Sequence, residues 1–488
     1  MARWFDCGRK WVAAWLACGV LLAVTAASAQ PSIVLILSDD EDVVSHRVMS
    51  QTKALVADQG AVLDNFFVTN AFCCPSRTTI MRGQYGHNHR IEGNELPAGG
   101  FAKFQALNLG TNTVATWLHS AGYRTAFLGK LLNGYEPGRD APLPGWDEWY
   151  AVGGRFRNFD YTLNENGTVV AYGDAPEDHL TDVLARKAAD VIRRTPAGQP
   201  LFVYVAPYDP HSPATPAPRY ADLYQDVPPD ISPSFDEADV SDKPSYVAQL
   251  AHLAEWQKEA ITRHNRERLR ALRAVDDLVA TVVEALDASG RLDDTYIIYT
   301  SDNGFHMGQH RLFMGKTTAY DEDIRVPFAI RGPGIRAGQH LRQMVLNNDL
   351  APTFSAIAGV TPPRYVDGRS FLELFAHPDR PWRRSFLIER RQMETHELVG
   401  YAVLDALRTA RHTYVEYGTG ERELYDLAAD PYQTKSITNT ADPALVEAMA
   451  SRLAELKNCA SDACRLLEDL PVEPEPTPVA EHGTPVKG

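Results

Sequence analysis

The chain has 488 residues, of which 44% are hydrophobic and 23% are charged, as is ordinary for a globular protein. This length exceeds what one small core needs and predicts one large domain with a smaller one. The formal net charge of −15 argues against nucleic-acid or anionic-membrane partners, so any anionic substrate would have to bind in a local basic pocket.

Residues 1–29 have the features of an export signal. Three basic residues precede a largely apolar stretch at residues 11–24, and Ala27-Ser28-Ala29 matches an A-x-A cleavage site. The apolar stretch is short for a membrane anchor. We therefore expect no membrane span in the mature protein. We expect a secreted or periplasmic location, or a lysosome-like location in a eukaryotic host.

Apolar runs alternate with helical patterns over the next 270 residues or so. The runs SIVLIL at residues 32–37 and YIIYT at residues 296–300 are apolar or nearly so throughout, which indicates strands buried on both faces of a parallel sheet. Further strands are expected at 124–128 and 201–206, and helices at 46–58, 111–121, 178–194 and in a long segment ending at 288. This alternation predicts an α/β doubly wound domain.

The pattern changes near residue 381. Short strand patterns at 385–389, 398–403, 413–416 and 423–427 precede a helical pattern at 443–456. They predict a small antiparallel sheet with a packed helix. The expected division is therefore an export signal at 1–29, a catalytic domain at 30–380, a C-terminal α+β subdomain at 381–470 and a disordered tail at 471–488.

Two further segments stand out. Residues 212–245 are rich in Pro, Asp and Ser without periodicity, which predicts a long surface excursion. Cys459 and Cys464 are closely spaced near the C-terminus, and in an exported protein we expect them to form a short-loop disulfide. Cys73 and Cys74 then have no obvious partner, which leaves Cys73 available for modification.

Two pairs of oxygen-bearing side chains, Asp39-Asp40 and Asp302-Asn303, each follow a predicted buried strand. Ligand sites in α/β sheets gather beyond the carboxyl ends of the strands. Carboxylate and amide oxygens suit Ca²⁺ or Mg²⁺ better than zinc. One such pair alone would more often cap a turn or a helix. Two pairs at two strand ends favour a metal site.

The run CCPSRTTIMRG, at residues 73–83, carries the most chemical information. It places the thiol of Cys73 beside Pro75, Ser76 and Arg77 at the entry to a helix-like segment. The arginine is always protonated and would hold an anion near Cys73, and the start of the segment offers unpaired backbone N–H groups. The alternative is a pair of buried cysteines that pack as small apolar residues.

This run resembles the Cys-x-Pro-Ser-Arg signature of the sulfatase family, and the resemblance extends from Ser32 to about Cys464. It implies an alkaline-phosphatase-like fold with a large, mixed, mostly parallel sheet flanked by helices. It also implies that a formylglycine-generating enzyme converts Cys73 to formylglycine before export, and that the hydrated aldehyde is the nucleophile. One Ca²⁺ would be bound by the modified Cys73 with Asp39, Asp40, Asp302 and Asn303.

The resemblance also implies roles for four basic side chains. Arg77 matches the arginine that fixes formylglycine. Lys130 in GKLLNGY and Lys316 in FMGK match the two lysines that bind sulfate. His211 in PYDPHSP matches the histidine near the leaving group. Together they imply catalysis in which cations neutralise the sulfuryl oxygens and a histidine protonates the departing alcohol.

One position departs from the pattern of many arylsulfatases, which carry a histidine two residues after the first lysine. Here that position is Leu132. Another base must then break down the sulfated intermediate, and His310 or His306 is the candidate. The departure is common in the glucosamine-6-sulfatase and extracellular heparan-sulfatase branch, which the chain resembles through CCPSR, GKLLNGY and SDNGFHMGQHRLFMGK.

The expected substrate is therefore a sulfated carbohydrate, an amino sugar or glycosaminoglycan of the glucosamine-6-sulfate type. An arylsulfatase of broad specificity is one alternative. A phosphatase or phosphonate hydrolase on the same fold is another, although the single oxygen-rich cluster and CCPSR argue against it. A non-catalytic glycan-binding protein is less favoured, because binding alone does not need a modifiable cysteine.

Overall fold

The computed structural model describes Met1 and residues 30–154, 157–391 and 403–472. The expected export signal, apart from Met1, and the expected tail from residue 473 onward lie outside the described residues. Within the described residues, no helix has both the length and the apolar character that a membrane span requires.

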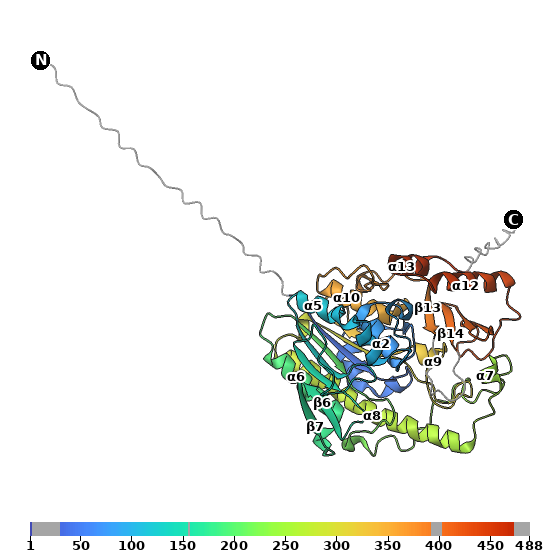
Figure 1. Cartoon of the computed structure of the whole chain (residues 1–488), viewed down its shortest axis with the longest axis horizontal. Coiled ribbons are helices and arrows are strands. Elements are labelled where there is room, and N and C mark those ends of the chain that lie inside the picture. The colour runs from blue at the N-terminus through green and yellow to red at the C-terminus, as the bar shows by residue number, and fades with distance from the viewer. Residues whose placement is uncertain (2–29, 155–156, 392–402, 473–488) are drawn as a thin grey trace, which may run out of the picture.

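A ten-stranded sheet forms the centre of the molecule (Figure 1), in the order β11-β2-β10-β9-β1-β8-β4-β5-β6-β7. Strand β1 (Ser32–Ser38) lies between β8 (Leu201–Ala206) and β9 (Thr295–Ser301) and runs parallel to both. The other strands are β2 (Ala61–Leu63), β4 (Arg124–Lys130), β5 (Glu148–Val152), β6 (Tyr161–Glu165), β7 (Thr168–Tyr172), β10 (Phe328–Arg331) and β11 (Gln339–Leu341). Strands β6 and β10 run against their neighbours, so the predicted mixed, mostly parallel sheet is confirmed.

The apolar sequence of β1 is explained by two cores, one on each face of the sheet. Ile33, Leu35 and Leu37 pack in the core that contains α2 (Cys73–Arg82), α5 (Val114–Ser120) and α10 (Leu350–Ile357). Val34 and Ile36 pack in the other core, with α6 (Leu180–Arg194) and α8 (Glu255–Ala288). Each buried side chain of this kind contributes about 1.5–3 kcal/mol. The alternation fixes the register of β1 and therefore the place where the chain leaves the sheet.

Helix boundaries differ from the expected ones in three places. Helix α6, expected from 178, begins at Leu180 after a 3-10 turn at Pro176–Asp178. The segment expected as one helix at 46–58 is a 3-10 turn at Ser45–Val48, the short α1 (Ser50–Thr52) and a π turn at Lys53–Ala57. Helix α5 begins at Val114 rather than at 111, because Thr113 is extended and caps it. The remaining short elements are β3 (Phe66–Phe67), β12 (Val345–Leu346), α3 (Gly86–His89), α4 (Gly100–Ala106), α7 (Ser245–Ala248), α9 (Asp321–Ile324) and α11 (Glu373–Ala376).

A separate four-stranded antiparallel sheet follows, as predicted. Its strands are β13 (Ser385–Arg390), β14 (Leu404–Thr409), β15 (His412–Tyr417) and β16 (Arg422–Asp426), and α12 (Pro443–Leu456) and α13 (Asp462–Asp469) pack against it. The strand expected at 398–403 lies, except for Val403, outside the described residues. The second strand of this sheet is β14 instead, whose polar Asp405 and Arg408 obscure its apolar pattern. The expected domain division near residue 380 stays a prediction.

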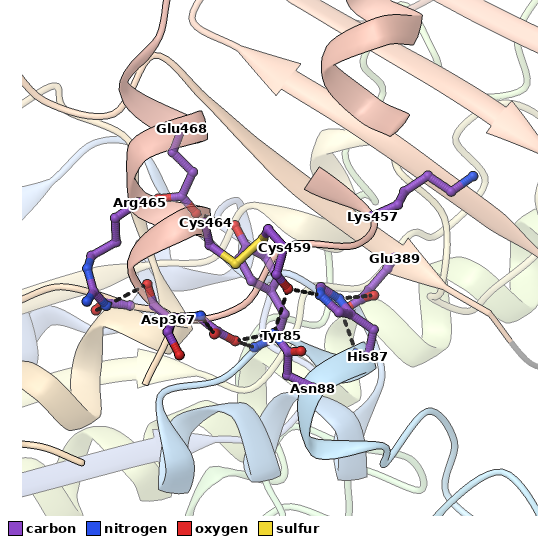
Figure 2. Close-up of a disulfide and its surroundings, with 12 residues drawn as sticks. Tyr85, His87, Asn88, Asp367, Glu389, Lys457, Cys459, Cys464, Arg465 and Glu468 are labelled. Atoms are coloured by element: carbon purple, nitrogen blue, oxygen red, sulfur yellow. Dashed lines mark hydrogen bonds and ion pairs between the residues drawn. A yellow bond between two sulfur atoms is a disulfide. The ribbon is translucent and has the colours of Figure 1, made fainter. Parts of the chain in front are cut away.

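The predicted disulfide between Cys459 and Cys464 is present, and it lies beside the partly buried His87 (Figure 2). The carbonyl oxygen of Cys459 is 2.8 Å from Nε2 of His87, and Nδ1 of His87 is 2.9 Å from the Glu389 carboxylate. Both ring nitrogens therefore face acceptors, which favours the doubly protonated imidazolium. Burial acts to lower the pKa of His87, but the hydrogen bond and charge of Glu389 outweigh it and the pKa is raised.

We predict that His87 stabilises the fold most at low pH. A raised folded-state pKa gives a stabilisation that is complete below the unfolded pKa of about 6.5 and is lost as the pH rises through the folded value. The excess melting temperature of wild type over His87→Gln should therefore shrink as the pH rises above about 6.5. His340→Gln, which removes an exposed histidine 3.0 Å from Asp64, is the control and should show a flat difference. An excess that grows with pH would contradict the prediction.

Candidate active site

The site begins where β1 and β9 leave the sheet side by side. The register pairs Ser38 with Ser301, so Asp39 and Asp302 emerge as neighbours. The amide of Asp40 donates to the Asp302 carboxylate at 3.1 Å, and Nδ2 of Asn303 donates to the Asp40 carboxylate at 2.7 Å. All four side chains are buried. The structure thus brings together the two oxygen-bearing pairs that the sequence places at strand ends.

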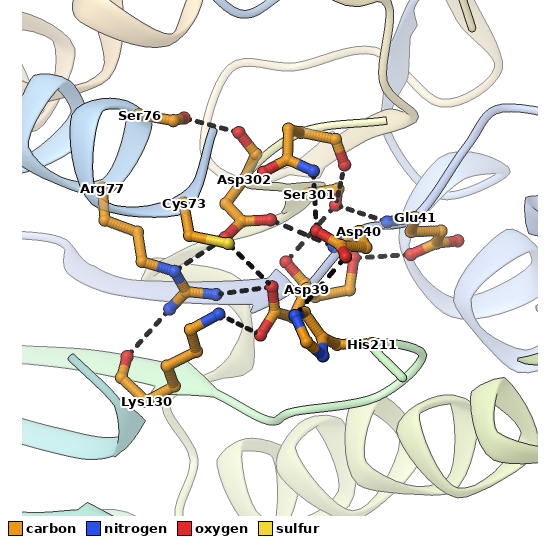
Figure 3. A network of polar contacts seen from close by, with 12 residues as sticks. Asp39, Asp40, Glu41, Cys73, Ser76, Arg77, Lys130, His211, Ser301 and Asp302 are labelled. Atoms are coloured by element: carbon orange, nitrogen blue, oxygen red, sulfur yellow. Dashed lines mark hydrogen bonds and ion pairs between the residues drawn. The ribbon is translucent and has the colours of Figure 1, made fainter. Parts of the chain in front are cut away.

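Cys73 approaches this cluster from the first residue of α2 (Figure 3). Pro75 fits here because the first turn of a helix does not need its missing N–H. The helix ends at Gly83, whose φ of 68° is the left-handed conformation that glycine adopts without strain. Ser76, in the first turn, donates to the backbone carbonyl of Asp302. This bond fixes the start of α2 against the exit of β9.

The Cys73 sulfur lies between an ammonium group and a carboxylate. It is 2.8 Å from Nζ of Lys316 and 3.7 Å from Oδ1 of Asp39. Burial raises the pKa of the Cys73 thiol to about 11, because the charges of Lys130 and Lys316 offset only part of that effect. The unmodified side chain is therefore a neutral thiol at pH 7 and a weak nucleophile.

Arg77 holds the cluster together from the next turn of α2. Its Nε donates to Asp302 at 2.7 Å, and one Nη donates to the backbone carbonyl of Lys130 at 2.8 Å. Its other Nη lies 3.7 Å from the Asp39 carboxylate. The side chain is only 1% exposed. Burial opposes the charged guanidinium, but Asp302 and Asp39 outweigh that effect and keep the pKa of Arg77 raised.

Two lysines and a histidine complete the cluster. Nζ of Lys130 is 2.5 Å from the Asp39 carboxylate, and Nζ of Lys316 contacts the Asp40 carboxylate. Nε2 of His211 lies 3.7 Å from Asp40, and its Nδ1 is 2.7 Å from the carbonyl of Ser212. That carbonyl fixes the proton on Nδ1 and aims Nε2 at the cluster.

The ionised state of Asp39 depends on these cations. Burial alone would raise the pKa of Asp39, but the charges of Lys130, His211 and Arg77 outweigh it and the pKa lies well below its usual range. The pKa of Asp40 is lowered in the same way, chiefly by Lys316 against burial. The cluster therefore presents ionised carboxylates to any cation that enters it.

The donor set fits a hard cation. One ligand atom from each of Asp39, Asp40, Cys73 and His211 lies within 4.8 Å of the others. Oδ1 of Asn303 is buried and has no hydrogen-bond partner among the described residues. A buried polar atom without a partner is costly, and a metal ion would satisfy it. Carboxylate and amide oxygens are the ligands that Ca²⁺ prefers.

His310, the candidate base, lies in a different buried group. Its Nδ1 is 2.7 Å from Glu237, and its ring stacks on Tyr320 with centroids 3.9 Å apart. Its Nε2 is 3.9 Å from the Glu322 carboxylate. Burial lowers the pKa of His310 well below its usual range. These contacts do not bring the ring against Cys73, so its catalytic role stays a prediction. His306, the other candidate, is 2.9 Å from Asp323.

A further buried side chain at this site is Arg268 of α8, which sequence reasoning did not single out. It donates to the backbone carbonyl of Asp40 at 2.7 Å. A signal was present in the sequence, because Arg268 continues the stripe of Leu272 and Val275 at helical spacing. A cation on the buried stripe of a helix must have a partner in the interior.

We predict that Arg77→Met destabilises the protein and abolishes turnover. The change leaves the Asp302 carboxylate buried without its partner, which costs about 3–5 kcal/mol. The unfolding midpoint in urea is the measurement. Arg139→Met is the control, because Arg139 pairs with Asp140 at the surface and its loss should change stability by less than about 0.5 kcal/mol. Equal midpoints for wild type and Arg77→Met would contradict this account of the site.

Comparison with known families places these residues in context. The sulfatase family profile matches residues 31–360, and a profile for the C-terminal part of N-sulphoglucosamine sulphohydrolase matches residues 308–459. N-acetylglucosamine-6-sulfatase of Capra hircus is 33% identical over 480 residues, covering 90% of this chain and 85% of that protein. The arylsulfatase of Volvox carteri is 34% identical, covering 91% and 77%. The extracellular sulfatase SULF-1 homologue of Drosophila melanogaster is 37% identical over 74% of this chain and 33% of that protein.

Solved structures confirm the fold. BT4656, in complex with its substrate D-glucosamine-2-N,6-O-disulfate, superposes with a TM-score of 0.75 at 21% identity, over 90% of this chain and 99% of that one. Phosphonate monoester hydrolase of Agrobacterium radiobacter superposes with a TM-score of 0.67 at 22% identity, over 88% and 95%. Because this fold serves both chemistries, the sequence relatives decide between them. The profile match and these relatives show that the chain belongs to the sulfatase family and is an enzyme that hydrolyses sulfate esters.

Proposed function

We propose that this sulfatase uses a formylglycine formed from Cys73 and one bound Ca²⁺ to release 6-O-sulfate from a sulfated amino sugar of the glycosaminoglycan type. The observation that carries the proposal is the position of the Cys73 sulfur. It lies 2.8 Å from Lys316 and 3.7 Å from Asp39, at the start of a helix and inside a buried group of carboxylates and cations.

Cys73 is better placed than Cys74 to serve as the nucleophile in the folded protein. The sulfur of Cys74 instead accepts the backbone N–H of Asn133 at 3.1 Å, and burial raises its pKa above that of Cys73. When present, formylglycine supplies a hydrated aldehyde whose second hydroxyl allows sulfate to be expelled without attack by water. Because Cys73 is buried in the folded chain, a formylglycine-generating enzyme would act before folding and export. The export signal expected at 1–29 supports a secreted or periplasmic location.

Asp39, Asp40, Asp302 and Asn303 would hold the Ca²⁺ together with the modified Cys73. The ion would polarise the sulfuryl oxygens and favour the ionised form of a hydroxyl at position 73. The donor set supports this assignment, since it offers three carboxylates and an unpartnered amide oxygen.

The basic side chains have separate roles. Lys130 and Lys316 lie beside the position of the nucleophile and would neutralise the charge on the sulfuryl oxygens. Arg77 fixes the start of α2 against Asp302 and does not need to move during the reaction. His211 is 17% exposed, and the Ser212 carbonyl holds its Nδ1–H. Burial lowers the pKa of His211 against the charges of Asp40 and Asp39, so the ring would act as the acid only as the imidazolium, whose Nε2–H would protonate the departing sugar oxygen.

The choice of substrate rests on the relatives. An N-acetylglucosamine-6-sulfatase is 33% identical over 90% of the chain, and the substrate of BT4656 carries a 6-O-sulfate on glucosamine. Leu132, where many arylsulfatases carry histidine, supports the same branch. An arylsulfatase of broad specificity is the second candidate, because the Volvox carteri arylsulfatase is 34% identical over 91% of the chain.

We predict that Cys73→Ala abolishes sulfatase turnover while Cys74→Ala retains substantial activity. Both variants lose one buried sulfur, so they are matched for packing. Cys73 contacts Lys316 and Asp39, whereas Cys74 contacts Asn133, so only the loss of Cys73 would remove the proposed nucleophile. Turnover of a sulfate ester and circular dichroism of both variants are the measurements. Full activity in folded Cys73→Ala would rule out the proposed nucleophile.

We predict a higher kcat/KM for glucosamine-6-sulfate than for a nitrophenyl sulfate. A sugar hydroxyl leaves less readily than a phenol, so it depends more on protonation. His211→Ala should reduce kcat/KM by about 10²–10⁴-fold on the sugar and by much less on the aryl ester. A wild-type preference for the aryl ester, or equal losses on both substrates, would favour the arylsulfatase alternative.

A further inference from the structure

Arg268 contacts three of the segments that build the active site, and it reaches them from a helix outside the cluster. Its side chain is 0% exposed. One Nη donates to the backbone carbonyl of Asp40 at 2.7 Å and to the Asp42 carboxylate at 2.8 Å. The other Nη lies 3.5 Å from the carbonyl of Pro210, the residue before His211. The guanidinium stacks 4.7 Å from the ring centroid of Phe305, which follows the exit of β9.

The contact with Asp40 falls on a constrained part of the backbone. Asp40 has a φ of 67°, in the left-handed region that residues other than glycine seldom adopt. Such a conformation persists only where the surroundings hold it. It turns the carbonyl of Asp40 toward α8, where Arg268 binds it, and leaves the carboxylate directed at Lys316 and Asn303.

The loop that carries His211 is tied to the same face of α8. His264 lies one turn before Arg268, and its Nε2 is 3.1 Å from the hydroxyl of Ser212. The ring of His264 also packs against Phe305, with centroids 6.0 Å apart. The two α8 side chains therefore bracket His211, one at the residue before it and one at the residue after it.

We propose that Arg268 is a positioning residue that fixes the direction of the Asp40 carboxylate toward the Ca²⁺ and the place of the His211 loop. The proposal rests on the calcium site proposed above. Arg268 touches neither the Cys73 sulfur nor a metal-ligand atom. It acts through the main chain of Asp40 and of Pro210, so its loss should loosen the site without removing any ligand.

Arg273 provides a matched control from the same helix. It also pairs with a carboxylate, that of Asp276 at 2.8 Å, and it also donates to a backbone carbonyl after β1, that of Val48. Val48 and its neighbours provide no ligand to the cluster. Arg273 is 16% exposed and Arg268 is fully buried, so the control matches Arg268 in its helix and its types of contact. A positioning role would lower calcium affinity in Arg268 variants that stay folded and leave the affinity of Arg273 variants unchanged.

The test measures calcium affinity by calorimetry on chelator-stripped protein, together with kcat and KM on glucosamine-6-sulfate. Arg268→Met should weaken calcium binding by about 10–100-fold, as the loss of a group that orients a ligand does, and should lower kcat more than it raises KM. Arg268→Lys keeps a positive charge near Asp42 but lacks the planar guanidinium. Its calcium affinity should therefore lie between those of Arg268→Met and wild type. Arg273→Met should leave the affinity within about twofold of wild type, since it orients no ligand.

Each of these measurements either supports or overturns the positioning role of Arg268. The inference would be overturned if Arg268→Lys and Arg268→Met had the same calcium affinity and kcat as wild type. That result would leave the proposed calcium site intact. Equal losses in the Arg268 and Arg273 variants would also overturn the inference. If Arg268→Met does not fold, Arg268→Lys is compared with wild type and Arg273→Met instead, because its positive charge still pairs with Asp42. A wild-type protein that binds no calcium would overturn the proposed metal site, and the inference with it.

Discussion

The active site depends on the pairing of β1 with β9. This pairing places the carboxylates that follow the two strands in the protein interior, where they are stable only if positively charged side chains pair with them. Asp39 and Asp302 leave adjacent strands, and Arg77 and Lys130 bind them within 2.7 Å. Buried charges are stable only when paired and hydrogen-bonded, so removal of one partner costs more than the pair contributes. The start of α2 and the end of β4 are thereby fixed against the same point, and the Cys73 sulfur is fixed with them.

This charge pattern explains how a strongly acidic protein can act on an anionic ester. The surface as a whole repels polyanions, since the net charge is −15. At the cluster, Lys316 contacts the Cys73 sulfur and Lys130 contacts Asp39, and the proposed Ca²⁺ would add two positive charges. The attraction is therefore local and short-ranged, and it favours one bound sulfate over a long polyanionic surface contact. His211 lies at the partly exposed side, where the alcohol would depart in the proposed reaction.

Much of this arrangement was predictable from the sequence. Strands buried on both faces appear as continuous apolar runs, and Asp39-Asp40 and Asp302-Asn303 mark their ends. Strands β2, β5, β6, β7, β10 and β11 were not predicted. Strands β2, β10 and β11 have only three or four residues, and most residues of β7 are exposed, so neither length nor apolar burial marks them in the sequence. Contacts between distant segments also escape a sequence pattern. No local spacing shows that Arg268 reaches Asp40, or that His310 pairs with Glu237. The sequence indicates which residues are reactive, and the packing decides which of them meet.

The most direct test of the central claim is the mass of the peptide that contains Cys73, taken from fully active protein made in a host with a formylglycine-generating enzyme. The account predicts that Cys73 is present as the aldehyde or its hydrate and that Cys74 remains a thiol. Activity should rise in proportion to the converted fraction across preparations. Fully active protein in which Cys73 is an unmodified thiol would contradict the account.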